Sequence, residues 1–436
     1  MINQVESAGE SESQAPVVAV LGTMDTNREA IKLACDALEA AGSRPTVWDF
    51  SLRPHAIPGA DVTGDRLVEV GGSDWESVGA LTRAEAGAVM IRGAADLLSA
   101  EVASGRLQGG LGIGGANGTS MACGVMREMP LLFPKVMVSV VASTAAVQWY
   151  VGGSDIVMFP SVGDISSNRI TDRIIDNAAR SVSAMARGWM GRDPQQEVPP
   201  LVGISSFGGT AGCVDRVEQR LREAGREVIM FHASGPGGRA LEKLAGAGDL
   251  SGVVDVTTHE LIDLVVGGVY SAGEQRLRAA GETGLPQVIV PGALDHSNFW
   301  VGQVPEQFKE REFFQFNEQN LLMRTNAPEY EALGRLMAQR INAASGPVAV
   351  LIPTRGFSEH TSRQTFDLEG NPVGHWHQPQ ADARLAEVLS DLLEEAPLRR
   401  FDLHINDPEF ADICADTFLE MADAGQSARS LDSQAP

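Results

Sequence analysis

GLGIGGANGTSMA, residues 110–122, is the stretch of sequence that decides the fold. Its first part, together with Gly109, is an apolar run typical of a buried strand, and the residues after it are typical of a helix. Five glycines and Asn117 leave the backbone bare where the helix begins. A strand that passes through glycines directly into a helix predicts one unit of a parallel α/β sheet.

The same succession of strand, small-residue loop and helix recurs along the chain. Up to Met190 we expect strands at 17–22, 46–50, 88–93, 109–115, 135–142 and 156–161, and helices at 28–41 and 165–190. The succession starts again at LVGISSFGGT (201–210). Further strand-and-loop segments follow at 226–234, 252–258, 286–295 and 346–356, with helices at 236–247 and 326–344. This alternation predicts α/β architecture, with mainly parallel sheets covered by helices on both faces.

The polar and proline-rich stretch GRDPQQEVPP (191–200) separates the two series and is typical of a domain linker. A chain of 436 residues is also too long for one ordinary core. We therefore predict a disordered leader at 1–15, an N-terminal domain at 16–190, a linker at 191–200, a C-terminal domain at 201–425 and a disordered tail at 426–436.

The composition argues against several classes of protein. The net charge of −23 disfavours general nucleic-acid binding, which needs a basic surface, although backbone amides could still hold one small anion. The four cysteines lack C-x-x-C spacing, which disfavours a zinc site and favours a reducing cytoplasmic setting. No apolar run is long enough to span a membrane, and the acidic N-terminus does not have the pattern of a signal peptide.

Ligands of parallel α/β sheets bind at the carboxyl ends of the strands, so the loops there are the candidates for a site. IGGANGTS (113–120) could hold a phosphate with the N–H groups of the helix start, or it could be a tight turn capped by Thr119 or Ser120. It lacks the lysine of a Walker loop. In LGTMDTN (21–27), Asp25 could bind a ribose hydroxyl or magnesium, or cap the next helix. Two such loops in one sheet favour a shared nucleotide site.

The loops of the C-terminal half carry candidate anion-binding and acid–base groups. HASGPGGRA (232–240) places Arg239 at a helix start, where it could bind a phosphate or carboxylate, or form a surface salt bridge. PGALDHSNF (291–299) and PTRGFSEH (353–360) add carboxylate, imidazole, amide and guanidinium groups that could form an anion or carbonyl site. The candidate catalytic residues are His232, Arg239, Asp295, His296, Asn298 and Arg355, and each could instead have a purely structural role.

Two other patterns carry less weight. His375 and His377 would share one face of a strand, but no third metal ligand is evident. Ser205 and Ser206 lack the G-x-S-x-G elbow of a serine hydrolase. The sequence therefore gives little support to a metal site or a hydrolase triad.

Taken together, these segments resemble the Tm-one-like ATP-binding family, an uncharacterised family that includes the N-terminal part of a plant tobamovirus-resistance protein. The matching segments cover nearly the whole chain in order: VLGTMDTN (20–27), IGGANGTSMA (113–122), MPLLFPKVMVSVVAS (129–143), YVGGSDIVMFPSVGDISSNRI (150–170), HASGPGGRAL (232–241), PGALDHSNF (291–299), LMRTNAPE (322–329) and IPTRGFSEH (352–360). The resemblance implies two Rossmann-like subdomains, bound ATP with Mg²⁺, and a homodimer or higher homo-oligomer.

The resemblance also implies which residues bind the nucleotide. They are Gly22, Thr23, Asp25, Thr26, Gly114, Gly115, Gly118, Thr119 and Ser120, with Arg92 added because it stands at the end of the strand predicted at 88–93. The chain departs from the family pattern at three places. Asn27 stands where a lysine is usual, Ala116–Asn117 where Ser-Gly is frequent, and Gly209–Thr210 where threonine pairs are frequent. Asn27 removes a direct lysine–phosphate contact.

Two functions of different classes fit these observations. The first is an enzyme of unassigned reaction that binds ATP and acts on a small anionic or carbonyl substrate in a cleft between the domains. The second is a non-catalytic nucleotide-binding module that regulates or binds a partner. A dehydrogenase is less favoured, because no acidic ribose partner completes the dinucleotide fingerprint around Gly112, Gly114 and Gly115. Of these functions we favour the enzyme. We expect no membrane as a binding partner.

Overall fold

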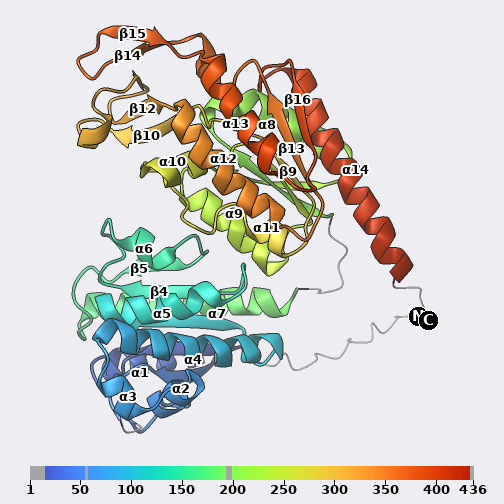
Figure 1. Cartoon of the computed structure of the whole chain (residues 1–436). Helices are drawn as coiled ribbons and strands as arrows, with labels where there is room; N and C mark the ends of the chain where they lie inside the picture. The colour runs from blue at the N-terminus through green and yellow to red at the C-terminus, as the bar shows by residue number, and fades with distance from the viewer. Residues whose placement is uncertain (1–14, 55–56, 193–198, 433–436) are drawn as a thin grey trace, which may run out of the picture. The chain divides into compact units, whose positions relative to one another are not determined.

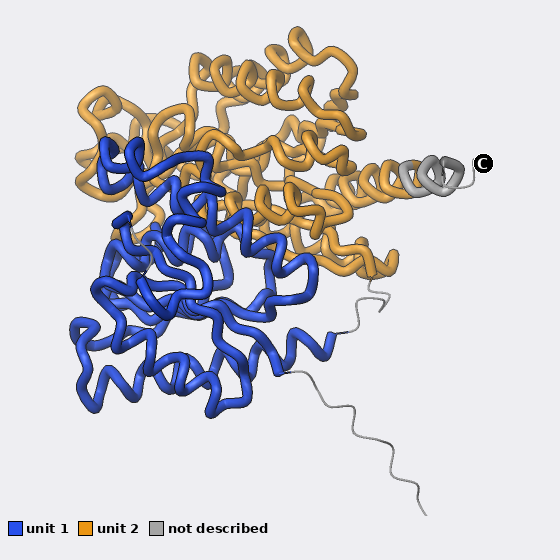
Figure 2. Tube along the Cα trace, turned by 90° about the horizontal axis from the view of Figure 1, so that it is seen from below, with its two compact units in different colours: residues 1–196 blue, residues 197–436 orange. Residues whose placement is uncertain are grey.

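The chain divides into two compact units, residues 1–196 and 197–436 (Figure 2). The computed structural model describes residues 15–54, 57–192 and 199–432. The predicted leader at 1–15 lies almost entirely outside the described residues, as do residues 193–198 of the predicted linker and the last four residues. Each unit contains a parallel sheet flanked by helices, so the predicted α/β class with two Rossmann-like domains is confirmed (Figure 1).

The first unit is built on a five-stranded, wholly parallel sheet. Its strands, in spatial order, are β2 (Arg44–Asp49), β1 (Val17–Gly22), β3 (Gly109–Gly114), β4 (Lys135–Ser139) and β5 (Val157–Pro160). The helices are α1 (Arg28–Ala40), α2 (Gly64–Val70), α3 (Trp75–Gly79), α4 (Arg83–Ala103), α5 (Ala116–Glu128), α6 (Val147–Val151) and α7 (Arg169–Met190). Side chains of β1 alternate between a core shared with α4 and α5 and a core shared with α1 and α7.

The prediction of a strand at 88–93 is wrong, because this segment lies inside α4. A capping box between Thr82 and Glu85 starts that helix. Within AVMIRG the buried residues Val89, Met90 and Gly93 fall at helical spacing rather than alternating. The apolar run was too short to distinguish a buried strand from a buried helix segment.

The second unit has a six-stranded parallel sheet of β16 (Leu398–Phe401), β13 (Val348–Pro353), β9 (Gln287–Ile289), β8 (Gly252–Asp255), β6 (Leu201–Ser206) and β7 (Glu227–His232), in that spatial order. Its helices are α8 (Ala211–Glu223), α9 (Pro236–Ala247), α10 (Glu260–Val266), α11 (Ala279–Glu282), α12 (Ala327–Asn342), α13 (Pro379–Leu392) and α14 (Pro408–Asp432), with 3-10 turns at Gly208–Thr210, Glu306–Phe308 and Glu359–Ser362. Helices α8 and α14 share one core with the sheet, and α10, α12 and α13 share the other.

A second sheet in this unit was not predicted. It is antiparallel and consists of β10 (His296–Trp300), β12 (Asn320–Arg324), β11 (Phe313–Gln315), β14 (Gln364–Phe366) and β15 (Pro372–His375) (Figure 1). The segment DHSNF, expected as a loop, therefore enters a strand at His296. Helix α14 reaches Asp432, beyond residue 425, where we expected disorder to begin. None of the helices in the described residues is long and apolar enough to cross a membrane.

Candidate functional site

The two glycine and threonine loops of the first unit meet at the carboxyl end of its sheet. Strands β1 and β3 are parallel neighbours with Gly22 paired to Ile113, so the loops that follow them lie side by side. Residues 23, 25–27 and 115–118 line a common cavity of about 460 Å³, which Arg53 and Arg83 also line. This placement follows the rule for open parallel sheets.

Helix α5 begins at this cavity without a side-chain cap. Its N-cap residue, Gly115, has φ −66° and ψ −168°, and no side chain bonds to the first turn. The first helical hydrogen bond runs from the Thr119 N–H to the Gly115 carbonyl at 2.8 Å, so the N–H groups of residues 116–118 have no partner within the helix. Such a helix start attracts an anion.

The glycines at this turn have two different roles. A Cβ at Gly114 would lie 2.8 Å from the Gly118 Cα, so glycine here allows the strand and helix to pack closely. A Cβ at Gly115 would meet nothing within 4 Å. Gly115 also has an ordinary backbone conformation, so neither packing nor strain requires a glycine there. The open space beside it lies where a ligand would approach the amides.

Five residues predicted to bind nucleotide lie away from this cavity lining among the described residues, and one of them is Gly114, whose packing role is given above. The buried Thr119 hydroxyl bonds to Ser139 at 2.6 Å and to the Gly114 carbonyl at 3.2 Å, which removes it as a helix cap. Ser120 is exposed on the next helical position. Arg92 is exposed on α4, where it donates to the Gly71 carbonyl at 3.4 Å. Gly22 has a packing role, since a Cβ would lie 2.9 Å from the Ile31 side chain.

The first loop is organised by its own side chains. Thr23 and Thr26 hydroxyl oxygens lie 2.6 Å apart, and the Asn27 amide donates to Thr23 at 2.9 Å. The Asp25 carboxylate pairs with Arg53 at 3.1 Å rather than capping α1, whose N-cap, Asn27, makes no side-chain capping bond. A carboxylate, a guanidinium and several hydroxyl groups therefore surround the cavity.

The third glycine loop, HASGPGGRA, is occupied from within the protein. The buried Glu260 carboxylate accepts hydrogen bonds from the N–H groups of Gly235 at 2.6 Å and Gly238 at 3.0 Å, at the start of α9. Arg276 completes its bonding at 2.7 Å. Arg239 is exposed and donates only weakly to the Ser271 carbonyl, at 3.4 Å. This loop holds the protein's own carboxylate where we expected an external anion.

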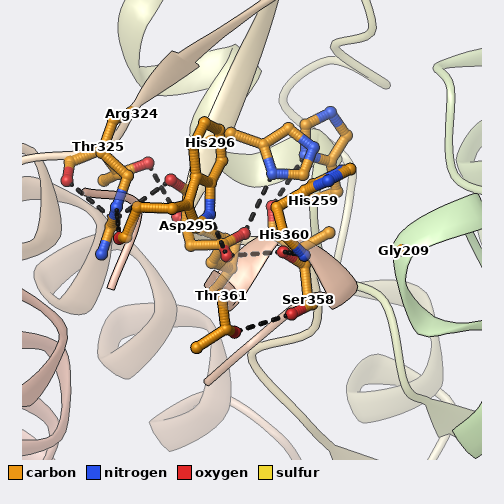
Figure 3. A network of polar contacts seen from close by, with 12 residues as sticks. Gly209, His259, Asp295, His296, Arg324, Thr325, Ser358, His360 and Thr361 are labelled. Atoms are coloured by element: carbon orange, nitrogen blue, oxygen red, sulfur yellow. Dashed lines mark hydrogen bonds and ion pairs between the residues drawn. The ribbon is translucent and has the colours of Figure 1, made fainter. Parts of the chain in front are cut away.

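A second polar cluster lies where strands β8, β9 and β13 give way to their loops (Figure 3). Its centre is the buried pair Asp295–His296, with 2.9 Å between Oδ1 and Nδ1. The other carboxylate oxygen accepts from the Ser358 hydroxyl at 2.6 Å and the Trp376 indole N–H at 2.8 Å. Asn298 follows on the same face of β10 and is fully buried. Three of the six predicted catalytic residues are therefore brought together.

The electrostatics of this pair fix its protonation. Burial alone would raise the pKa of the Asp295 carboxyl, but its bonds to His296 and Ser358 and the nearby Arg324 charge bring it below the ordinary value. Burial lowers the pKa of His296 to about 4, against the opposing effect of Asp295. At neutral pH the carboxylate is therefore charged and the imidazole neutral. Since the carboxylate can only accept, His296 carries its proton on Nδ1 and a lone pair on Nε2.

The other three predicted catalytic residues do not join the pair. Arg239 lies at the α9 start, and Arg355 is exposed and paired with the exposed Asp402 at 2.7 Å. His232 is exposed at the end of β7, with its ring 5.3 Å from that of Phe207. The expectation of an anion site built from these arginines finds no support in the second unit.

Sequence reasoning missed two members of the cluster, His259 and Trp376. His259, fully buried, bonds through Nδ1 to the Ala293 carbonyl at 2.9 Å, and its ring lies 4.8 Å from that of His296. Trp376 and His360, the latter from the predicted loop PTRGFSEH, also contact His296, with ring centroids 5.8 Å and 5.4 Å from it. The signal for His259 was present, because it follows β8 at the same edge as the loops we examined. The Nε2 atoms of His259 and His296, the Nδ1 of His360 and the Asn298 Oδ1 have no hydrogen-bond partner.

Metal binding gains no support from this geometry. No group of three or more His, Cys, Asp or Glu side chains among the described residues is arranged to hold a metal ion. His375 and His377 are both exposed, on either side of the buried Trp376.

Comparison with known proteins places the chain in a family. Residues 16–190 match the N-terminal domain of an uncharacterised protein family, UPF0261, and residues 199–422 match its C-terminal domain. The chain belongs to the UPF0261 family. A UPF0261 protein of Rhizobium meliloti is 39% identical over 421 residues, covering 93% of this chain and 99% of that protein. The resemblance drawn from the sequence motifs is confirmed by tomato relatives.

One such relative is the ToMV resistance protein Tm-1(GCR237) of Solanum lycopersicum, 32% identical over 443 residues, which cover 94% of this UPF0261 chain and 56% of the tomato protein. The chain thus matches about half of that longer protein. A crystal structure of UDP-N-acetylglucosamine 2-epimerase matches 88% of this chain and 92% of its own at 10% identity, with a TM-score of 0.22. A similarity of that size carries no argument about function.

Proposed function

We propose that this UPF0261 protein is an enzyme that performs acid–base chemistry on a small carbonyl compound with Asp295 and His296, and that it binds ATP on its first unit. The observation that carries the catalytic part is the Nε2 atom of His296. It is buried and unpartnered, while Nδ1 is fixed by a carboxylate. A positioned imidazole of this kind can take a proton from a bound substrate.

The surrounding bonds favour this role over a serine hydrolase. In a catalytic triad the serine hydroxyl bonds to the imidazole that activates it. Here Ser358 donates to the Asp295 carboxylate instead, at 2.6 Å. The carboxylate therefore orients the histidine and is itself held by Ser358 and Trp376. We favour a carbonyl compound over an anion because Arg239 and Arg355 are directed elsewhere.

The cavity at the α5 start supports the proposal of ATP binding. Its uncapped N–H groups and the open space beside Gly115 suit a phosphate, and Arg53 and Arg83 add positive charge. Asp25, at the same cavity, is the residue that would hold a Mg²⁺ ion with the phosphates. We also propose the homodimer that the family resemblance implies, which light scattering after gel filtration would test.

Titration calorimetry with ATP and Mg²⁺ tests the nucleotide part. The wild-type chain should bind, and the variant Gly115→Val should bind at least about 100-fold more weakly, because its side chain fills the space next to the amides without straining the backbone. Gly188→Val is the matched control, since Gly188 is also surrounded by open space but lies on the exposed face of α7. Equal affinity of all three proteins would contradict the assignment of this cavity.

Metabolite profiling tests the catalytic part. The purified protein is incubated with a small-molecule cell extract and ATP–Mg²⁺, and the extract is analysed by mass spectrometry. We expect a compound that is consumed by the wild type and by Arg355→Gln but not by His296→Gln. If His296→Gln changes the extract as the wild type does, the catalytic proposal fails and the non-catalytic nucleotide-binding module is favoured.

A further inference from the structure

Three of the buried atoms in the second unit that lack a hydrogen-bond partner lie on neighbouring residues of this cluster. They are His259 Nε2, His296 Nε2 and Asn298 Oδ1, on residues that are fully buried. His259 donates from Nδ1 to a backbone carbonyl, and His296 donates from Nδ1 to a carboxylate. A neutral ring that donates from Nδ1 carries a lone pair on Nε2. All three unpartnered atoms are therefore acceptors when the rings are neutral.

The residues that carry these acceptors are neighbours. The rings of His259 and His296 lie 4.8 Å apart. The Asp263 Oδ1 atom accepts from the Asn298 N–H at 2.9 Å and lies 3.9 Å from His259 Nε2. Leaving buried acceptors unpaired costs about 1–3 kcal/mol each, so an arrangement with three of them together indicates a missing donor-bearing partner.

The charges around these atoms indicate the sign of that partner. Asp295 and Asp263 are buried beside the two histidines, and burial raises the pKa of Asp263 to about 6, which leaves it largely charged at pH 7. The buried guanidinium of Arg324 is taken up by Asp382 and by carbonyl groups of residues 295, 325 and 376. Two carboxylates thus flank the acceptors, and the buried cation next to Asp295 is directed away.

Aromatic faces complete the surroundings. The Phe207 ring stacks on His259 at 4.7 Å and 17°, and Tyr270 meets both rings edge-on at 6.0–6.5 Å. Aromatic faces attract organic cations. Because the described residues offer no cluster arranged for a metal ion, the fitting cation is an organic one.

We propose that this site binds a small primary amine as its ammonium ion, with His259 Nε2 and Asn298 Oδ1 as acceptors for two of its N–H groups and His296 Nε2 facing the third, whose proton it can take. The proposal rests on the proposed function in one respect, that the amine belongs to the carbonyl substrate on which His296 acts. The substrate would then carry both an amino group and a carbonyl group.

Phe207 provides the means of entry. Its side chain is partly exposed, and it is followed by the exposed Gly208, where an added Cβ would meet nothing within 4 Å. The Phe207 ring covers one face of His259 and belongs to neither core of the unit, so the ring can turn away without disturbing them.

Thermal unfolding with three matched probes tests the proposal on the full chain. Ethanolamine supplies the ammonium group, ethylene glycol is its neutral counterpart, and glycolate is an anionic one. We expect ethanolamine at saturating concentration to raise Tm by about 3 °C or more, and the other two to leave it unchanged. The shift should disappear in His259→Phe and in Asn298→Leu. Glu306→Gln, which removes an exposed surface charge, is the control and should keep the full shift.

Nitrogen NMR of the wild-type imidazoles avoids any dependence on the folding of variants. Ethanolamine should shift the Nε2 resonances of His259 and His296 and leave their Nδ1 resonances in place. The proposal is overturned if these resonances do not move, or if glycol or glycolate stabilises the protein as ethanolamine does. Because binding is measured without turnover, a failure here leaves the catalytic role of His296 standing, and an inactive profile in the extract experiment leaves amine binding standing.

Discussion

Helices α5 and α9 begin alike in sequence and differently in structure. Both follow a strand of a parallel sheet through a run of glycines. At α5 the first turn has no side-chain cap, whereas at α9 the Glu260 carboxylate bonds to Gly235 and Gly238. A Cβ would meet nothing at Gly115 but would lie 2.0 Å from the Glu260 carboxylate at Gly238. A glycine-rich helix start therefore shows only that the amides are accessible, not whether a ligand or the protein itself occupies them.

The same contrast holds for the loops at the carboxyl ends of the two parallel sheets. In the first unit the polar groups of the loop at 23–27 line an open cavity. In the second unit, Asp295, His296 and Asn298 are buried. The first arrangement is open to a ligand as it stands, whereas a ligand of the second must reach buried groups.

The largest expected effect comes from removing the internal carboxylate at α9. Glu260→Gln should lower the free energy of unfolding of the second unit by about 3–5 kcal/mol, because Arg276 loses one of its buried partners. Urea unfolding measures this change. Asp402→Asn, which breaks only the exposed pair with Arg355, should leave the midpoint where it is. In Glu260→Ala the start of α9 is open to an external anion, as the start of α5 is. Added formate should therefore restore part of the lost stability. A Glu260→Gln variant as stable as the wild type would break the comparison.

A smaller effect is expected from pH. His296 has a lowered pKa of about 4, so the unfolded chain binds its proton first, and this residue reduces stability as pH falls from 6.5 to 4, by about 3 kcal/mol in total. Asp263 has a raised pKa of about 6, so it adds stability as pH falls from 6 to 4. In the wild type these two contributions oppose each other.

Single variants should separate them. Relative to the wild type, Asp263→Asn should lose more stability on acidification across this window, and His296→Gln should lose less. Denaturant melts of the three proteins at pH 4.5 and 6.5 provide the measurement. If the free energy of unfolding changed equally with pH in all three proteins, the pKa shifts of Asp263 and His296 described here would be wrong.

The space around the glycines at the starts of α5 and α9 differs, and this predicts a difference in the cost of adding a side chain there. A Cβ at Gly238 would lie 2.0 Å from the Glu260 carboxylate, so Gly238→Ala should cost about 1–3 kcal/mol. Gly115→Ala, in open space, should change the free energy of unfolding by less than about 0.5 kcal/mol. Differential unfolding of the two variants checks this, and equal costs would contradict the distinction between an open and an occupied start.

The smallest effect concerns strain beside His259. Ala293 has φ 56°, a left-handed conformation that glycine adopts more readily, and its carbonyl accepts the bond from His259. Ala293→Gly should therefore stabilise the second unit by up to about 1 kcal/mol. A loss of stability on calorimetry would show that the Ala293 methyl group, which is buried, contributes more through packing than its conformation costs.

The sequence predicted the fold class and the location of the first site because both depend on local patterns. Alternating strands and helices imply parallel sheets, and the loops after β1 and β3 must then meet at one edge. The strand wrongly expected at 88–93 shows the limit of this approach. A six-residue apolar run suits either element, and only its packing against the sheet in α4 distinguishes them.

The second site was only partly predictable. Asp295, His296 and Asn298 were found because they are close in sequence at a strand end. The role of Glu260 depends on a contact with Gly235, 25 residues away, and that of Trp376 on a contact with Asp295 over 81 residues. No local pattern reports such distances. The exposure of Arg239 and Arg355 likewise depends on tertiary packing that the sequence does not reveal.

The Arg276 guanidinium has a consequence for how the second unit opens. It bonds to Asp255 at the end of β8, to Glu260 in α10 and to Glu242 in α9. Glu242 in turn accepts from the N–H groups of residues 277–279, at the start of α11. One side chain thus joins four elements, and none of them can separate without exposing buried charge. In hydrogen exchange, the amides of residues 235, 238 and 277–279 should therefore open together as a single cooperative group, and α11, although only four residues long, should be as protected as the helices around it.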